Sequence, residues 1–375
     1  MKPGFGPTNG VNRSSRGSGF GPPSGSPRRA VVISEQMGAP LDEGIRKFAT
    51  CLVGGLSAHV ETYGIAAGCG SSAGIRAPGG KLFRSHALRD SLRAVGPDLI
   101  VYVPSASGTL FSFLRARALK RIQPSAHVAL VLTQGRRHTA PVRMLLHRLA
   151  PDSVFCQSAA TMRYLESIGI ASRFLPSGVD LAAFQPVSPA EKDRLRMKYR
   201  LPAGEFLVLH AGHLTRERNT GLLGKLEGVG RGVMLAGRSA GRDPQIKRRL
   251  EEQGDIVIDT YVERVEELYQ AVDCYLFPVR QEDAAMEFPL SVLEAMACNL
   301  PVVAHPYGGL PLALEPRDGL VFAESDDEML DAVRKSKHIH ANTRDQAKSF
   351  GWASVAARVL DAAEVRNAGA IVAAV

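Results

Sequence analysis

The segment MEFPLSVLEAMACNLPVVAHPYGGLP, residues 286–311, combines residue types that could bind an anion or a sugar. Pro289 is tolerated in the first turn of a helix, and LSVLEAMA continues it with apolar residues at helical spacing. The free backbone N–H groups of such a turn can hold oxygen atoms of a ligand. Glu294 lies one turn further on, and a carboxylate among apolar neighbours must be exposed or have a partner. An ordinary exposed helix acid is the alternative interpretation of Glu294.

Basic residues gather on the helix expected near residues 108–121 and just after it. They are Arg115, Arg117, Lys120 and Arg121, followed by Arg136, Arg137, Arg143 and Arg148. A solvated helix face is one interpretation, and contact with an anionic membrane surface or an anionic acceptor is the other. Nucleic-acid binding is not expected, because no recognition helix, RNP-like aromatic pattern or zinc finger accompanies the charge.

Other chemistries lack their motifs. No Gly-x-Gly-x-x-Gly or GxxxxGK[ST] loop follows a predicted strand, which argues against a Rossmann dehydrogenase and a P-loop NTPase. No His-Glu-x-x-His or Asp-x-Asp motif appears, so no obligatory metal or other cofactor is expected. The 5 cysteines include no Cys-x-x-Cys pair and predict reduced thiols in a cytosolic protein. No apolar stretch reaches the roughly 18 residues of a membrane span.

The elements that must position these residues form two similar series. Apolar runs predict buried strands at 30–34, 98–103 and 127–132, and again at 206–212, 232–237, 255–260, 273–278, 301–305 and 319–323. Helical patterns lie near 43–58, 84–94, 108–121, 141–149, 158–168, 243–253, 263–271, 290–298, 326–336 and 342–366. Strands that alternate with helices indicate parallel sheets covered on both faces. The sequence therefore predicts an α/β protein with two doubly wound, Rossmann-like domains.

The expected domain boundaries follow from composition. Residues 1–29 are rich in Gly, Ser and Pro, contain no acid and predict a disordered basic tail without a secretory signal. The two domains are expected at 30–180 and 181–350, with a helix at 351–375 for which a return to the first domain is one option. Parallel sheets bind ligands beyond the carboxyl ends of their strands, so a cleft between the domains is the expected site.

Charge is divided unevenly along the chain, whose net charge is +9. Residues 1–180 contain 22 Lys and Arg but 9 Asp and Glu, whereas residues 181–375 contain 24 and 28. This asymmetry suggests that the first half faces an anionic partner such as a phosphorylated substrate, a membrane surface or nucleic acid.

The second half resembles the family 4 glycosyltransferases, which have the two-domain GT-B architecture. The resemblance runs from SVFCQSAATMRYLESIGI through FLPSGVDLAAFQP, HAGHLTRERN, VMLAG and DCYLFPV to EAMACNLPVVA, over most of residues 150–325. GVDLAAFQP and PLSVLEAMACNLPVV together are its most specific parts. The first half matches more loosely, through strand order and PLDEGIRKFA.

The resemblance implies roles for particular residues. Glu294 matches the family's ribose-binding glutamate, and Glu287 is the candidate for the sugar hydroxyls, although Met286 occupies the matching position. The remaining implied donor-binding residues are His213, Arg218, Phe288, Pro289, Leu290 and Ser291. Gln134 stands where the family commonly has a histidine near the reacting sugar, and Gly44 resembles its glycine loop for phosphate or acceptor. Arg218 can fork to two phosphate oxygens and is expected, with Glu287 and Gln134, to serve catalysis.

The function that the resemblance implies is transfer of a sugar from a nucleoside diphosphate sugar to an acceptor, with retention of configuration. The acceptor would be a glycan or a lipid-linked sugar, in glycan or cell-envelope polysaccharide and glycolipid synthesis. The expected location is the cytoplasm, with the inner face of a membrane as an option. Met286, His213 and Gln134 depart from the family pattern, which leaves two alternatives open. They are a catalytically lapsed nucleotide-sugar-binding or scaffold protein and a nucleotide-sugar epimerase of the same architecture.

Overall fold

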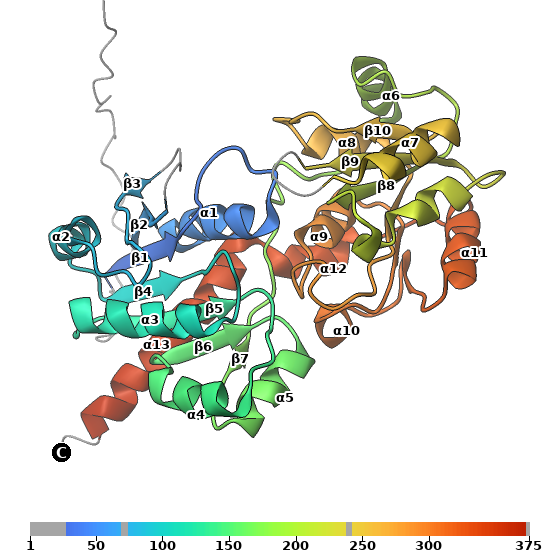
Figure 1. Ribbon diagram of the computed structural model, residues 1–375. Coiled ribbons are helices and arrows are strands. Elements are labelled where there is room, and N and C mark those ends of the chain that lie inside the picture. The colour runs from blue at the N-terminus through green and yellow to red at the C-terminus, as the bar shows by residue number, and fades with distance from the viewer. Residues whose placement is uncertain (1–27, 69–73, 238–241, 373–375) are drawn as a thin grey trace, which may run out of the picture.

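The computed structural model describes residues 28–68, 74–237 and 242–372, with side chains described as far as Glu364. Two parallel sheets, each with helices packed on it, lie side by side (Figure 1). Apart from its last two residues, the tail predicted at 1–29 lies outside the described residues. Each sheet has the α/β arrangement expected from the sequence.

The first domain contains a seven-stranded sheet of order β3-β2-β1-β4-β5-β6-β7, and all its neighbouring strands are parallel. The strands are β1 (Arg29–Ser34), β2 (Glu61–Ala66), β3 (Ile75–Arg76), β4 (Leu99–Tyr102), β5 (His127–Leu132), β6 (Ser153–Cys156) and β7 (Arg173–Phe174). The predictions at 30–34, 98–103 and 127–132 correspond to β1, β4 and β5. The other four strands were not predicted, because they are short or, like ETYGIA, carry little apolar patterning.

Five helices accompany the first sheet: α1 (Gly44–Ser57), α2 (His86–Val95), α3 (Leu110–Ile122), α4 (Ala140–Leu149) and α5 (Ala159–Ser167). Hydroxyl side chains fix where several of them begin. Ser85 Oγ accepts the N–H of Leu88 at 3.2 Å before α2, and Ser158 Oγ accepts the N–H of Thr161 at 3.1 Å before α5. Such caps satisfy amides that the helix itself leaves without a partner.

The second domain contains a six-stranded parallel sheet of order β10-β9-β8-β11-β12-β13. The strands are β8 (Leu207–Gly212), β9 (Arg231–Ala236), β10 (Ile256–Ile258), β11 (Cys274–Phe277), β12 (Val302–Ala304) and β13 (Leu320–Phe322). All six coincide, to within two residues at each end, with the predicted strands. They could be predicted because central parallel strands read as continuous apolar runs.

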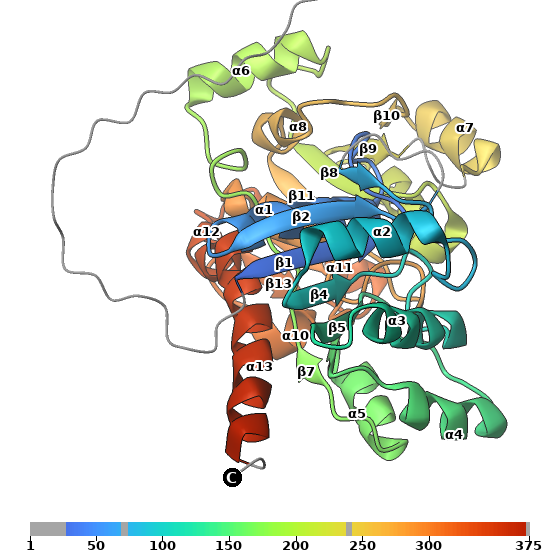
Figure 2. The same cartoon turned by 90° about the vertical axis from the view of Figure 1, so that its left-hand side faces the viewer.

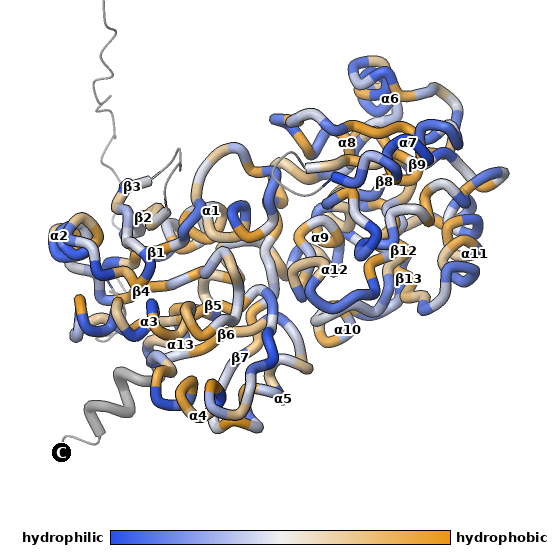
Figure 3. Tube along the Cα trace, viewed as in Figure 1, coloured by the Kyte–Doolittle hydropathy of each residue, from blue (hydrophilic) through white to orange (hydrophobic). Residues whose placement is uncertain are grey.

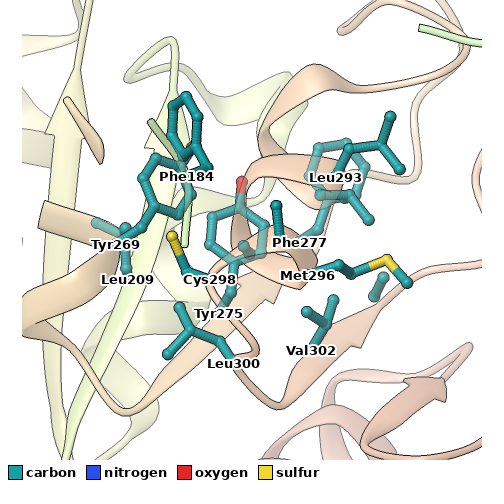
Figure 4. Close-up of a cluster of buried hydrophobic side chains, with 14 of the residues drawn as sticks. Phe184, Leu209, Tyr269, Tyr275, Phe277, Leu293, Met296, Cys298, Leu300 and Val302 are labelled. Atoms are coloured by element: carbon teal, nitrogen blue, oxygen red, sulfur yellow. The ribbon is translucent and has the colours of Figure 1, made fainter. Parts of the chain in front are cut away.

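The helices of the second domain are α6 (Pro189–Lys198), α7 (Pro244–Glu252), α8 (Glu266–Ala271), α9 (Leu290–Ala297), α10 (Leu310–Ala313), α11 (Asp326–Ser336) and α12 (Arg344–Ala347). Figure 4 shows side chains of α8, α9 and β11 packed together, among them Tyr269, Tyr275 and Met296. Short 3₁₀ turns cover 216–218, 220–225 and 348–350. Helix α9, which carries Glu294, is therefore held in the core of this domain.

The last helix returns to the first domain. Helix α13 (Trp352–Val372) packs on α1, and its residues Val355 and Val359 belong to the same buried cluster as the first sheet (Figure 2). The prediction of a single helix over 342–366 was wrong, because the chain is extended at Gly351. There Gly351 forms a β-bridge with Val179, and the N–H of Val179 donates to the carbonyl of Phe350 at 2.8 Å.

Candidate functional site

A pocket of about 310 Å³ lies between the two domains. The loop before α1 and the start of α1 line it from the first domain. The ends of β8 and β9, the segment before α8 and the first turn of α9 line it from the second. These segments follow the carboxyl ends of parallel strands, where open α/β sheets bind ligands. The pocket is thus at the place predicted from topology.

Two glycines let the domains approach closely around this pocket. A Cβ on Gly44 would lie 2.9 Å from Met286 Sδ, and a Cβ on Gly237 would lie 2.8 Å from the carbonyl oxygen of Asp42. Gly44 is the first residue of α1, and the Glu43 carboxylate caps that helix by accepting the N–H of Arg46 at 2.8 Å. Gly44 lines the pocket, and its lack of a side chain also makes room for the second domain.

Glu294 lines the pocket from α9 and is only 5% exposed. Lys47 Nζ of α1 lies 2.6 Å from Glu294 Oε1, so the ion pair crosses from one domain to the other. The Tyr269 hydroxyl also hydrogen-bonds Glu294. Burial is the main cause that raises the pKa of Tyr269 well above 10. Glu294 is consequently a partnered carboxylate in the pocket and not an exposed helix acid.

Arg218 and His213 line the pocket beside the end of β8. The Arg218 Nε donates to the carbonyl of Ala284 at 2.9 Å, and no ion pair joins Arg218 to a carboxylate within the described chain. Burial lowers the pKa of the Arg218 guanidinium from its ordinary value. Burial, and then the nearby Arg218 charge, lowers the pKa of His213 to about 4, so this imidazole is neutral at pH 7. The pocket thus holds a guanidinium that forms no ion pair in the described structure, beside a neutral imidazole, with the Glu43 carboxylate acting on the guanidinium only at longer range.

The first turn of α9 forms another wall. Pro289, Leu290 and Ser291 all line the pocket, and no side chain caps the N-terminus of this helix. Its first amides therefore lack a capping partner and could bond oxygen atoms of a ligand. The helix dipole also favours negative charge at this end.

Glu287 differs from its expected role, because its carboxylate points to the first domain. Its Oε1 accepts the Thr161 hydroxyl at 2.5 Å and the Gly135 N–H at 3.1 Å, and Glu287 does not line the pocket. Burial raises the pKa of Glu287, and its Oε2 is buried without a hydrogen-bond partner. Met286 lines the pocket instead. The Glu287 carboxylate is therefore a contact between the two domains.

Gln134 and Phe288 are also placed outside the pocket lining. Gln134 Nε2 donates to the carbonyls of Ala285 at 2.8 Å and Asp283 at 3.2 Å, which ties β5 to the segment before α9. Phe288 is fully buried in the core of the second domain, with its ring against Phe174 at a centroid distance of 5.9 Å. Both residues therefore make structural contacts that support the segment leading into α9, and the roles expected of them remain predictions.

Sequence reasoning missed several lining residues. Lys47, Asp180, Phe184, Tyr261, Glu263 and Glu266 are examples. Lys47 lies three residues after Gly44, so the helical period of α1 was the signal that could have found it. Asp180 accepts the N–H groups of Ala182 and Ala183 at 3.0 and 3.1 Å in the inter-domain connection.

The described residues contain no group of three or more His, Cys, Asp or Glu placed to hold a metal ion. No helix in the described ranges is long and apolar enough to cross a bilayer.

The sequence of the second domain matches a known protein family. Residues 209–336 match the family described as "Glycosyl transferases group 1". A D-inositol 3-phosphate glycosyltransferase of Xylanimonas cellulosilytica is 29% identical over 211 residues, which are 50% of this chain and 49% of that protein. The lipopolysaccharide core biosynthesis mannosyltransferase LpsB of Rhizobium meliloti is 27% identical over 217 residues, 53% and 58% of the two chains. The chain thus spans about half the length of the curated relatives it matches.

Solved structures resemble the whole two-domain arrangement. HepE of Anabaena, in complex with UDP and glucose, has a TM-score of 0.67 at 16% identity over 88% of this chain and 98% of its own. Sucrose-phosphate synthase of Thermosynechococcus elongatus has a TM-score of 0.66 at 19% identity over 88% and 97%. Both sheets of the present chain are parallel throughout, with a pocket between the domains. The fold of the chain is therefore the GT-B fold of these glycosyltransferase structures.

Proposed function

We propose that the chain is a retaining glycosyltransferase of the family 4 type, which moves a sugar from a nucleoside diphosphate sugar to an acceptor. The observation that carries the proposal is Arg218, a guanidinium without a carboxylate partner in the described structure, which lines one pocket together with Glu294 and the uncapped first turn of α9. A diphosphate offers Arg218 paired oxygen atoms and offers the helix an anion. A ribose offers Glu294 two hydroxyl donors.

The chemistry follows from the charges that develop. Breaking the bond from the anomeric carbon to the diphosphate places negative charge on the leaving group and positive charge on the sugar. Arg218 and the first amides of α9 would stabilise the departing diphosphate, which is the kind of interaction that lowers the barrier. His213 would add a hydrogen bond without a charge, since its pKa of about 4 keeps it neutral.

The two domains would divide the substrates between them. The second domain would hold the nucleoside diphosphate through Arg218 and Glu294, and residues 41–44 of the first domain would face the acceptor. The relative LpsB, a mannosyltransferase of lipopolysaccharide core biosynthesis, supports a glycan or lipid-linked acceptor. The similarly folded HepE, whose structure was solved in complex with UDP and glucose, supports a nucleotide-sugar donor.

The test begins with thermal unfolding of the full chain against UDP, GDP, ADP and their sugars. A nucleotide that binds only the folded state stabilises it by mass action and so raises the melting temperature. At a free nucleotide concentration of 100 times Kd the stabilisation is about 2.7 kcal/mol. The stabilising donor is then incubated with and without candidate acceptors, and the anomeric signal of the product is read by NMR. No stabilisation by any nucleotide would overturn the proposal, and an inverted product would overturn retention.

One observation favours a second candidate, a nucleotide-sugar-binding protein that has lost transfer. Met286 lines the pocket where the family pattern has a glutamate, and the Glu287 carboxylate bonds Thr161 instead. The same experiment separates the two: binding of a nucleotide sugar without transfer or hydrolysis supports the second candidate. Turnover of the donor removes it.

A further inference from the structure

Five arginines surround a second pocket, of about 390 Å³, on the first domain. Arg89 and Arg93 line it from α2, and Arg117 and Arg121 line it from α3. Arg84, just before α2, completes the set. Each helix thus contributes two cations four residues apart, which places them on the same helix face.

These five arginines have no counter-charges in the described structure. No carboxylate lines the pocket, and none of the five makes an ion pair or a side-chain hydrogen bond among the described residues. Other cations of α3 differ: Arg115 pairs with Glu35, and Lys120 Nζ lies 2.9 Å from Asp152 Oδ2. The basic residues predicted on α3 therefore fall into two groups. Arg115 and Lys120 form ion pairs, whereas Arg117 and Arg121 line this pocket.

Such an arrangement is unfavourable without an anion. Like charges at spacing i,i+4 destabilise a helix by roughly 0.2–0.5 kcal/mol per pair. Here two such pairs line one pocket from two helices. The arginines therefore repel one another along each helix and also across the pocket. A bound anion would remove both repulsions, and guanidinium groups can each fork to two phosphate oxygens.

The floor of the pocket is apolar and well packed. Leu82, Phe83, Leu114 and Ile122 contribute to it. The Phe83 ring is 1% exposed and meets the Tyr102 ring edge-on at 5.1 Å, and the Arg115 guanidinium lies 5.2 Å from its centroid. The Phe83 side chain beneath the arginines is consequently held in place by its neighbours.

The position separates this pocket from the proposed donor site. The two pockets share no lining residue. Helix α2 lies at the outer edge of the first domain, away from the second domain, and Figure 3 shows hydrophilic and hydrophobic residues mixed along it. A ligand here would not occupy the cleft in which a sugar is transferred.

We propose that the pocket between α2 and α3 binds a ligand that carries two or more phosphate groups, one for each arginine wall. Two sources share this chemistry: a small polyphosphorylated molecule and the phosphorylated headgroup of a lipid. The proposal is independent of glycosyl transfer, because it rests on the arginines of this pocket alone.

The first experiment titrates the full chain with sodium tripolyphosphate by calorimetry. Arg117→Gln/Arg121→Gln and, on the other wall, Arg89→Gln/Arg93→Gln should each weaken binding at least tenfold. The matched control is Arg143→Gln/Arg148→Gln, which removes the same charge from exposed residues of α4 that do not line the pocket and should change affinity less than twofold. Because the pocket arginines have no ion-pair partners in the described structure and each double substitution removes a like-charge pair, both pocket variants should have a melting temperature equal to or slightly above that of the parent.

A second arm distinguishes the sources. Flotation with phosphatidylcholine vesicles, with and without phosphatidylinositol 4,5-bisphosphate, is compared for the parent, the two pocket variants and the α4 control. Loss of both tripolyphosphate and vesicle binding in the pocket variants alone supports a lipid headgroup, and loss of tripolyphosphate binding alone supports a small ligand. The proposal is overturned if both pocket variants match the α4 control in both assays. It is also overturned if Arg218→Ala, and neither pocket variant, removes tripolyphosphate binding, since the interdomain pocket would then be the site.

Discussion

Lys47 Nζ of the first domain lies 2.6 Å from Glu294 Oε1 of the second, inside the pocket between them. The two side chains are 16% and 6% exposed, and Lys47 also lies 5.1 Å from the centroid of the Phe184 ring. The carboxylate proposed to bind the ribose is thus also a contact that joins the domains. A donor that engages Glu294 must share it with Lys47, so donor binding and domain closure should be coupled.

The first prediction concerns the coupling of this pair. Lys47→Met should destabilise the protein, because it leaves the Glu294 carboxylate in a buried site without its cation. Lys47→Met/Glu294→Gln should recover much of the loss, so that a double-mutant cycle gives a coupling of about 0.5–3 kcal/mol. Urea unfolding of the four proteins measures it. Additive effects of the two substitutions would show that the contact contributes no stability.

The second prediction separates the parts of the donor. Glu294→Ala should weaken nucleoside monophosphate and diphosphate alike, by about tenfold or more, because both contain the ribose and a bond to a charged group contributes about 1.5–3 kcal/mol. Arg218→Ala should penalise the diphosphate more than the monophosphate and should also lower kcat, since leaving-group charge grows toward the transition state. Calorimetry with both nucleotides and rates at saturating donor measure these effects.

The control for Arg218 is Arg216→Ala, two residues away. Arg216 pairs with Asp243 at 3.3 Å, is well exposed and does not line the pocket, so its removal should leave both affinities nearly unchanged. Equal losses of nucleotide affinity in the two arginine variants would show that the effect comes from the net charge of the protein and not from a contact of Arg218 with the diphosphate. A normal kcat in Arg218→Ala would remove the leaving-group role.

The sequence allowed much of the fold to be predicted, because parallel strands and their helices follow local patterns. The six strands of the second sheet and the pocket-lining first turn of α9 are examples. The short strands β3 and β7 were missed, because two residues carry no pattern of their own and pair only where a neighbouring strand is already in place.

The site was harder to predict where it depends on how the domains meet. Glu287 and Gln134 looked like ligand-binding residues, but each side chain bonds to the opposite domain. Lys47 was not singled out, since its partner Glu294 is more than 200 residues away in the chain. Local spacing places a residue on an element, whereas the packing of two domains decides which way that residue faces.

The third prediction is a pH effect at Glu287. Burial raises its pKa above the usual 4.5, so above that pH the folded protein keeps a proton that the unfolded chain has released. The free energy of unfolding should therefore fall as the pH rises through this range. Glu287→Gln, which cannot ionise, should become more stable relative to the parent as the pH rises above about 4.5. Thermal unfolding of both proteins across this range tests it, and a constant difference would contradict a raised pKa.

The last prediction concerns His213 in the pocket. Burial and the Arg218 charge lower its pKa to about 4, so it should meet a diphosphate as a neutral hydrogen-bonding group. His213→Gln keeps such a group and should bind nucleoside diphosphate within about threefold of the parent, whereas His213→Ala should bind more weakly by a neutral hydrogen bond of about 0.5–1.5 kcal/mol. Calorimetric Kd values for the three proteins measure this difference.

The pH dependence of the same affinities gives a sharper test, because the phosphate groups themselves titrate near pH 6. Dividing the Kd of the parent by that of His213→Gln at each pH cancels the titration of the ligand, which both proteins share. The ratio should stay constant from about pH 8 to about pH 5.5, since His213 is neutral throughout, and should fall only as the pH approaches the lowered pKa and the imidazolium attracts the diphosphate. A ratio that instead falls with a midpoint near 6.5 would mean that His213 titrates as an unburied histidine. In that case the imidazole would begin to add positive charge to the donor site just below neutral pH, and Arg218 would not be the only cation at the leaving group.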